Sequence, residues 1–529
     1  MASSTLDPAA PFDAMLSPML HNVEEDEPPK RRTPSQHARL ASLDVVRGFT
    51  ITLMIFVDDV GDAYPTINHS PWNGVTLADI VMPWFLFMVG ASMSMSLRKY
   101  LRGGRADRIV GTKACMLRAL KLFFLGVLLQ GGGWFDGYTY GFNLATMRWC
   151  GILNRIGWAY AITSALELWL PERPAPRGRS AHASVFTAHA SKWCFALLFV
   201  LLHLALLLLT WVPSWTSHYG PIGDSSSELL PAEARPTIEC DVRGAFKTPE
   251  CSAIGYYDRL IFGQDHLGVW MSARLPQCTS CYPGNPKKLF RPDCHWCTGA
   301  NMSGCPAEPP VWCFAHMYDP EGALATVPTV ASAWIGVHFG RCLKHDGLQG
   351  RPVQIMLHWL GFAAALVAAG VALSYVWLPM NKQAWTPSYL MFMAGTCGAA
   401  LLASYAILDA DLAPLASGTR GGKVRACARK LCAPLEYMGM NSILVFFWHG
   451  TASALINAFY WAPPAVGGGY QWEPREGALC DDKGVIYHKL LSAVIADAAV
   501  RQLVYVLLKI ACFMIGTWIC FKQGYFWKI

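Results

Sequence analysis

The residues best suited to chemistry lie in a polar loop at residues 58–79, between two long apolar runs. Gly and Pro interrupt this loop, which carries His69 among carboxylates and amides. A carboxylate beside an imidazole fixes the ring tautomer and raises the basicity of the other ring nitrogen. Asp58, eleven residues before His69, is expected to orient the ring, and Asn73 or nearby backbone N–H groups to stabilise an oxyanion. The pattern favours a catalytic histidine over the alternative, a structural histidine at a membrane edge.

The elements around this loop are predicted from composition. Of the residues, 53% are hydrophobic and only 15% charged, with a mean hydropathy of +0.27. A soluble chain carries roughly a quarter charged residues, and a membrane-spanning helix needs about 20 mostly apolar residues. The sequence therefore predicts an all-α polytopic membrane protein with about ten transmembrane helices, at residues 45–62, 78–97, 113–131, 150–170, 193–213, 324–342, 355–378, 386–408, 434–456 and 500–521.

Lys and Arg alternate between the connections. They gather in the amino-terminal tail and near residues 98–108, 173–192, 341–351 and 420–430, and are sparse at residues 63–77, 132–149, 379–385 and 457–484. Basic connections face the cytosol, so both termini are predicted to be cytosolic and the His69 loop to lie on the opposite side. This bias accounts for the net charge of +7 without nucleic acid as a partner.

The predicted organisation has four parts. These are a disordered cytosolic tail at 1–43, helices 1–5 with the His69 loop at 44–213, a Cys-rich non-cytosolic loop at 214–323, and helices 6–10 at 324–529. The tail shows no cleavable signal peptide, so the first span is expected to act as a signal anchor.

The large loop contains an even set of eight cysteines. In an oxidising compartment such a set predicts disulfides of undetermined connectivity, although two Cys-x-x-Cys pairs also fit a zinc site. Disulfides are favoured, no metal is expected, and Asn301 is predicted to be N-glycosylated. The disulfide candidates are Cys240, Cys251, Cys278, Cys281, Cys294, Cys297, Cys305 and Cys313.

Further polar residues are candidates for substrate binding. Ionisable groups in membrane segments are costly, so they are functional hypotheses by default. The structural alternative is hydrogen bonding across helices, or capping and turn formation in the loop. The candidates beyond Asn73 are Arg155, Asp258, His266, Asn441 and His449.

Eight ordered sequence blocks resemble the heparan-α-glucosaminide N-acetyltransferases and their plant and microbial relatives. They cover roughly residues 38–529. The blocks are SLDVVRG from Ser42, HSPWNGVTLADIVMPWFLF from His69, LNRIG from Leu153, GYYDR from Gly255, DHL from Asp265, YDPEG from Tyr318, GMNSIL from Gly439 and FWKI from Phe526.

The resemblance implies transfer of an acetyl group from cytosolic acetyl-CoA to the amino group of a lumenal amino sugar, such as the terminal glucosamine of heparan sulfate or a related glycan. It also implies that His69 carries the chemistry. The position eleven before it, asparagine in animal members, belongs to the active site as well, and here it is Asp58. This residue and the lack of an extra amino-terminal lumenal domain are similar to the plant-type branch.

Two mechanisms remain open at this stage. His69 either attacks the thioester and carries the acetyl group, or acts as a general base in a ternary complex, a role typically worth about 10²–10⁴ in rate. A secondary transporter of a small polar solute is the alternative function. A lysosomal or vacuolar membrane and a homodimer are what the resemblance implies.

Overall fold

Helices dominate the computed structural model, which describes residues 40–527 except 62, 65, 132, 136–138, 173–179, 223–225, 245–247, 269–311, 313–314, 346–347, 413–418 and 450–490. In the first half the helices are α1 (Ala41–Val60), η2 (Leu77–Ile80), α2 (Val81–Ser96), α3 (Arg98–Leu101), α4 (Arg105–Gln130), α5 (Ile152–Trp169), α6 (Ala181–Ala188), α7 (Ala190–Leu209), η3 (Ala232–Ala234), α8 (Ala253–Phe262) and η4 (Gln264–His266). In the second half they are α10 (Ala323–Thr326), α11 (Thr329–Cys342), α12 (Pro352–Val376), α13 (Pro387–Leu408), α14 (Arg420–Met440), α16 (Ser492–Val494) and α17 (Ala498–Lys522).

Each of the ten predicted apolar runs overlaps a helix, although the last part of the run at 434–456, from residue 450 on, lies outside the described residues. Among the described residues, six helical segments are long and apolar enough to cross a membrane, and a seventh qualifies if a bent pair of helices counts as one span. That pair is Gly421–Met440 and Ser442–His449, which meet at 71°. The predicted fold class, an all-α polytopic membrane protein, is confirmed. The remaining three runs form α1, α4 and α5, which do not meet the same test of apolarity and charge.

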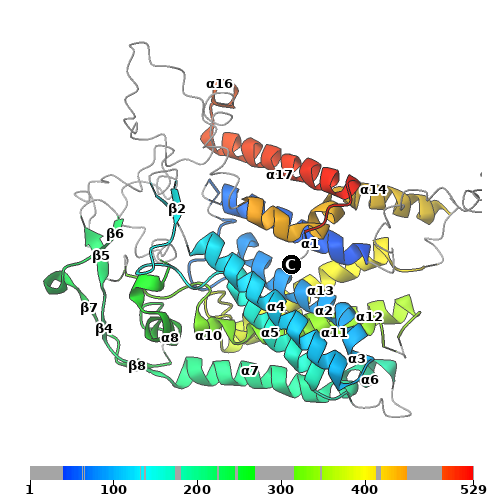
Figure 1. Cartoon of the computed structure of the whole chain (residues 1–529), viewed down its shortest axis with the longest axis horizontal. Coiled ribbons are helices and arrows are strands. Elements are labelled where there is room, and N and C mark those ends of the chain that lie inside the picture. The colour runs from blue at the N-terminus through cyan, green and yellow to red at the C-terminus, as the bar shows by residue number, and fades with distance from the viewer. Residues whose placement is uncertain are drawn as a thin grey trace, which may run out of the picture. The chain divides into compact units, whose positions relative to one another are not determined.

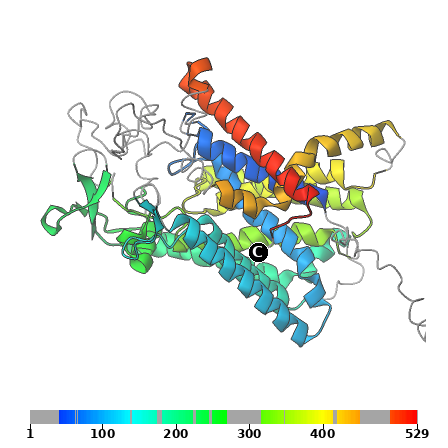
Figure 2. The same cartoon turned by 45° about the horizontal axis from the view of Figure 1, so that its top comes forward.

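The helices pack as long pairs. Helix α2 lies along α11, α12 along α13, α4 along α5, and α1 along α14, with α17 against both α1 and α14. Figure 1 shows α17 beside α14 and α1, and Figure 2 shows the α4–α5 pair from another side. Aromatic residues fill the core between these pairs; the rings of Phe87 on α2 and Phe339 on α11 lie 5.0 Å apart.

Two of these crossings depend on glycine. A Cβ at Gly90 of α2 would overlap the Ala333 carbonyl of α11, and one at Gly336 of α11 would overlap the Phe87 carbonyl of α2. Small residues let helix backbones approach closely where no hydrophobic effect drives association. The same relation holds between Gly48 of α1 and Gly439 of α14.

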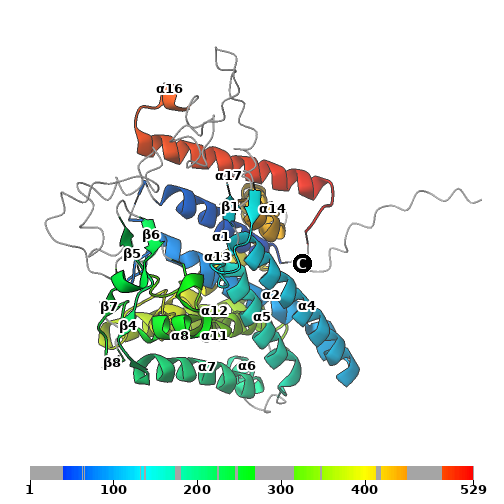
Figure 3. The same ribbon diagram turned by 60° about the vertical axis from the view of Figure 1, so that its left-hand side comes forward.

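Four two-stranded antiparallel sheets accompany the helices. They pair β1 (Gly133–Phe135) with β2 (Thr139–Gly141), β3 (Trp211–Val212) with β8 (Val242–Arg243), β4 (Trp215–Thr216) with β7 (Thr237–Ile238), and β5 (Tyr219–Ile222) with β6 (Ser226–Leu229). Three of the four follow α7, and α8 contacts both α7 and β3 (Figure 3).

The segment that contains α8 also contains a disulfide between Cys240 and Cys251. This bond confirms the predicted disulfide chemistry for two of the eight candidates. The other six cysteines and the predicted glycosylation site Asn301 lie outside the described residues.

Candidate functional site

The loop that carries His69 is fixed by contacts with the connection between α12 and α13. The backbone N–H of Gly74 donates to the Met380 carbonyl at 2.8 Å. Asn73 and Asn381 form an isolated antiparallel bridge, and the Asn381 side-chain amide donates to Asn73 Oδ1 at 3.1 Å. Two connections more than 300 residues apart therefore meet at His69, and the Asn73 side chain is used for this contact.

Asp79, in η2, holds the His69 ring. Its Oδ1 lies 3.0 Å from His69 Nδ1. Its Oδ2 accepts from the backbone N–H of Thr76 and the Thr76 hydroxyl at 3.1 and 3.0 Å, and from the backbone N–H of Ser70 at 3.1 Å. One buried carboxylate thus caps η2 with one oxygen and orients the imidazole with the other.

Lys382 completes this group from the α12–α13 connection. Its Nζ lies 2.8 Å from His69 Nδ1 and 3.5 Å from Asp79 Oδ1. Nδ1 either donates its proton to Asp79 or accepts one from Lys382, and these two tautomers place the reactive lone pair on different ring nitrogens. When Nδ1–H donates to Asp79, Nε2 is the basic nitrogen, and the lysine pairs with the carboxylate.

Asp58, the predicted partner of His69, lies on the other side of the ring. Its Oδ1 is 3.9 Å from His69 Nε2, and its side chain is 39% exposed, whereas that of Asp79 is 0% exposed. The structure therefore brings Asp58 and His69 together, but Asp79 makes the shorter contact. His449, another predicted residue, has its Nε2 3.9 Å from the carboxylate of Asp59, which also pairs with Lys509 at 2.8 Å.

The connection that supplies Lys382 has an unusual backbone. Trp385 has a φ of +50°, which is uncommon for a residue other than glycine. Its indole N–H donates to Ser332 Oγ at 3.0 Å, and the Arg155 guanidinium lies 5.2 Å from the ring centroid. Such strain persists only where surrounding contacts hold it, and it gathers at functional sites.

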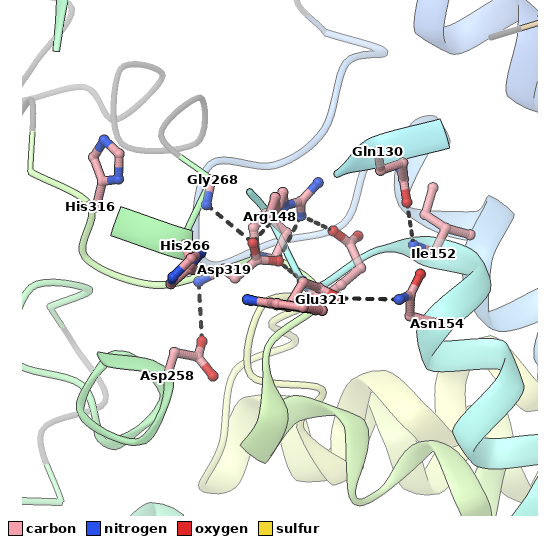
Figure 4. Close-up of polar contacts among 12 residues, drawn as sticks. Gln130, Arg148, Ile152, Asn154, Asp258, His266, Gly268, His316, Asp319 and Glu321 are labelled. Atoms are coloured by element: carbon pink, nitrogen blue, oxygen red, sulfur yellow. Dashed lines mark hydrogen bonds and ion pairs between the residues drawn. The ribbon is translucent and has the colours of Figure 1, made fainter. Parts of the chain in front are cut away.

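A second polar group, the Asp319 cluster, consists of Arg148, Asp258, Asp319 and Glu321 (Figure 4). Arg148 donates to both carboxylate oxygens of Asp319 at 2.6 Å and to Glu321 Oε2 at 2.6 Å. Burial alone would raise the pKa of Asp319, but the charge of Arg148 outweighs it and lowers that pKa.

Asp258, a predicted substrate-binding residue, organises the turn before α10. It accepts from the backbone N–H of Asp319 at 3.1 Å and of Ala323 at 2.8 Å. Its side chain is fully buried, and burial together with the negative charge of Asp319 raises its pKa to about 7. These contacts give Asp258 a structural function in the described state.

His266 lies at the edge of the Asp319 cluster and is partly exposed. Its Nδ1 is 2.6 Å from the Met147 carbonyl, and its ring centroid lies 6.2 Å from that of Trp149. The cluster connects to the His69 loop through Tyr318, whose ring lies 5.2 Å from that of Trp72.

The two remaining predicted residues have protein partners. Arg155 is 1% exposed and donates to the Pro320 carbonyl at 2.7 Å, so it ties the Asp319 segment to Trp385. Asn441 ends α14 and accepts from the backbone N–H of Trp527 at 3.2 Å, which anchors the carboxyl-terminal segment.

Sequence analysis missed Asp79 and Lys382, although each leaves a signal. Thr76 and Asp79 have the spacing of a capping box at the start of a predicted span. Lys382 is the one basic residue in residues 379–385, a connection otherwise without Lys or Arg. A lone lysine on the side that the positive-inside rule depletes is a candidate for function.

The fold and these two groups define the class: a polytopic α-helical membrane protein with a histidine, carboxylate and lysine site in connections between its helices. Residues 39–207 match the family described as heparan-alpha-glucosaminide N-acetyltransferase, catalytic. This match covers α1 through α7, and with it His69 and Asp79.

Two curated relatives carry the same name. The chain is 28% identical over 439 residues to heparan-alpha-glucosaminide N-acetyltransferase of Homo sapiens, covering 80% of this chain and 54% of the human protein. It is 26% identical over 523 residues to the Mus musculus protein, covering 96% of this chain and 63% of the mouse protein. These matches confirm the family resemblance that the sequence blocks indicate. The chain spans less than two thirds of the length of either relative.

Proposed function

We propose that this protein is a membrane acetyltransferase that moves an acetyl group from acetyl-CoA to the amino group of an amino sugar. The observation that carries this proposal is the His69 ring, which lies with Asp79 in the segment that matches a catalytic family. Asp79 holds the ring at 3.0 Å, and Lys382, from a later connection, lies 2.8 Å from it. Terminal glucosamine of heparan sulfate, named in the relatives, or a related glycan is the proposed acceptor.

Both mechanisms require a neutral His69 ring with a free lone pair, and both use the Asp79 carboxylate beside that ring. If the ring attacks the thioester carbonyl, the C–S bond breaks, CoA leaves as a thiolate that takes up a proton, and the acetyl group passes from the ring to the amine. If the ring is a general base, it accepts the proton of the amine as the amine attacks the thioester directly. In both cases Asp79 stabilises the positive charge that develops on the imidazole.

The proposed sidedness follows the distribution of Lys and Arg. Because basic connections face the cytosol, both termini are proposed to lie there with the acetyl-CoA supply, and the His69 loop is proposed to lie on the other side of a lysosomal or vacuolar membrane. His266, partly exposed beside the Asp319 cluster, is proposed to contact the sugar, with Asp258 supporting the turn behind it.

Transfer can be measured directly with purified protein, radiolabelled acetyl-CoA and glucosamine. We expect His69→Ala to reduce acetylglucosamine formation by about 10²-fold or more. His218→Ala, at a histidine whose side chain is 38% exposed, is the matched control and should leave the rate near that of the wild type.

The outcomes separate the alternatives. Unchanged transfer by His69→Ala would exclude the catalytic assignment. Absence of transfer by the wild type would favour a transporter of a small polar solute instead. Label that stays on His69 without acceptor would identify the acetyl-imidazole route.

A further inference from the structure

Three potential metal ligands lie together in the buried core, at the end of α11 opposite the Asp319 cluster. They are His338 and Cys342 on α11, and His358 on α12. One ligand atom from each lies within 4.8 Å of the others. All three residues are buried, with exposures of 1%, 0% and 7% in that order.

The spacing of these residues suits one ion. His338 and Cys342 are four residues apart on a helix, so both side chains lie on the same face. His338 Nε2 lies 3.0 Å from His358 Nε2, about 0.5 Å less than the roughly 3.5 Å between two imidazole nitrogens on a trigonal ion with metal–nitrogen bonds of about 2.0 Å.

Hydrogen bonds within the protein use little of the capacity of this cluster. A single hydrogen bond joins the two Nε2 atoms, so one ring donates a proton there and the other offers a lone pair. An ion between the rings would take a lone pair from both. The Cys342 thiol donates to the His338 carbonyl at 3.2 Å, a bond that a neutral thiol makes and a thiolate gives up.

The surroundings resemble those of established metal sites. Ligand imidazoles usually engage their second nitrogen with another group, which fixes their orientation. His358 Nδ1 lies 3.3 Å from Nδ1 of His182, and the two rings are stacked with 7° between their planes. Because His182 on α6 is partly exposed, it also offers a first contact for an ion that approaches the buried cluster.

We propose that His338, Cys342 and His358 bind one Cu(I) ion. Thiolate is a soft ligand that selects Cu(I), and a two-histidine, one-cysteine set is the trigonal ligand set of copper proteins. Binding releases the Cys342 proton, so the bound ion and thiolate together are electrically neutral.

Charge and ligand number argue against Zn(II). Zinc with one thiolate would leave a net positive charge in an apolar core, which is costly. Structural zinc also takes four ligands, and the group of close His, Cys, Asp and Glu residues found among the described positions has three members. The sequence predicted no metal, because these residues lie in two separate apolar runs.

The proposed ion would join α11 to α12. Helix α11 also packs on α2, and α12 on α13, so one ion would tie two helix pairs together. This inference is independent of acetyl transfer, and its test measures metal binding instead.

The test uses purified full-length protein in detergent under anaerobic conditions, with Cu(I) titrated against a Cu(I)-specific chelator and Zn(II) titrated separately. We expect one Cu(I) per chain, and loss of that stoichiometric binding in Cys342→Ser and His358→Asn. Cys397→Ser is the matched control, since Cys397 is also fully buried but belongs to α13 and lies outside the cluster.

X-ray absorption on the copper-loaded wild type keeps the proposal testable if a variant fails to fold. One sulfur and two nitrogen ligands are expected. Copper without a sulfur ligand, stoichiometric copper in folded Cys342→Ser, or tight zinc binding with no copper binding would each overturn the proposal.

Discussion

At the scale of single residues, Asp79 combines two functions in one buried side chain. One oxygen accepts three hydrogen bonds from Ser70 and Thr76, and the other faces the His69 ring. The geometry of the loop and the orientation of the imidazole are therefore set by the same group. Asp58 lies 3.9 Å from the opposite ring nitrogen, and its side chain is 39% exposed, whereas that of Asp79 is 0% exposed.

This difference predicts that Asp79→Asn is far more damaging than Asp58→Asn. The amide would place an N–H group, or a weaker neutral acceptor, against His69 Nδ1, and so disturb the ring tautomer. We expect kcat to fall by about 10²-fold or more in Asp79→Asn, and by much less in Asp58→Asn.

Because Asp79 acts through His69, the pH profile of kcat/KM is the decisive measurement. Loss of the carboxylate should move the acidic limb of that profile, on which the imidazolium loses its proton to give the reactive ring, to lower pH, since an imidazolium without its counter-ion loses its proton more readily. Equal losses in the two variants, with unchanged profiles, would show that Asp79 only supports the fold.

The candidate site was predictable only as far as it is local. Asp58 lies in the last turn of α1 and His69 in the loop that follows this helix, so their proximity follows from the sequence. Lys382 is 313 residues from His69 in the chain, and no pattern near either residue records that they meet. The turn that Asp258 completes and the packing of Arg155 against Trp385 likewise join residues that lie far apart in the sequence.

At the scale of helices, the long pairs are specified by small residues as much as by apolar ones. Gly90 and Gly336 sit face to face between α2 and α11, each against a carbonyl of the other helix. Since α2 follows Asp79 directly, and α11 carries Ser332 beneath Trp385, this crossing supports both connections of the His69 site.

We expect Gly336→Ala to destabilise the protein, because the new Cβ would overlap the Phe87 carbonyl and force the helices apart. Overpacking of this kind typically removes about 1–3 kcal/mol of stability. Gly361→Ala is the matched control in α12, where a Cβ would meet nothing within 4 Å, and it should raise stability by about 0.4–1 kcal/mol. Thermal unfolding in detergent measures the stability of both variants. Equal changes in stability would contradict the close crossing of α2 and α11.

Helix positions were predictable because apolar length is a local property, whereas helix ends were less so. The run at 113–131 belongs to α4, which begins at Arg105, since a polar, basic turn extends the helix without extending its apolar stretch. The run at 434–456 is broken near Asn441, where the chain bends by 71°. Such a break depends on the packing of the carboxyl-terminal segment against Asn441.

The turn before α10 should respond to pH through Asp258, whose pKa is about 7 in the folded protein against an ordinary value of 3.8. Below about pH 4 the group is protonated in both states and contributes nothing. Between about pH 4 and 7 the unfolded chain releases this proton while the folded chain retains it, so stability falls as pH rises. The total loss is at most about 4 kcal/mol.

Asp258→Asn should remove this decline, whatever its effect on stability at a single pH. The measurement is the unfolding free energy from pH 4 to 8, with Asp411→Asn at an exposed carboxylate as the control. If the unfolding free energy changes with pH equally in the wild type and Asp258→Asn, burial does not raise the pKa of the Asp258 carboxyl group.

At the scale of the whole molecule, the two ends of the helical core differ chemically. One end carries the His69 loop, the Lys382 connection and the Asp319 cluster, where acids, amides and a histidine meet. The other end carries the basic starts of α4 and α14 and the basic end of α11. This polarity, together with the disulfide between Cys240 and Cys251, supports a single orientation in the membrane.

That orientation predicts opposite accessibility for two sets of cysteines in sealed vesicles whose cytosolic face is outward. Cys427, exposed on the basic stretch of α14, should react with a membrane-impermeant maleimide without permeabilisation. Cys240 and Cys251 should react only after the vesicles are opened and the disulfide is reduced. Peptide mapping assigns each label to its cysteine, and Cys427→Ser is the control for the labelling of Cys427. Labelling of the reduced pair in intact vesicles, with Cys427 protected, would invert the orientation and place His69 on the same side as the acetyl-CoA supply.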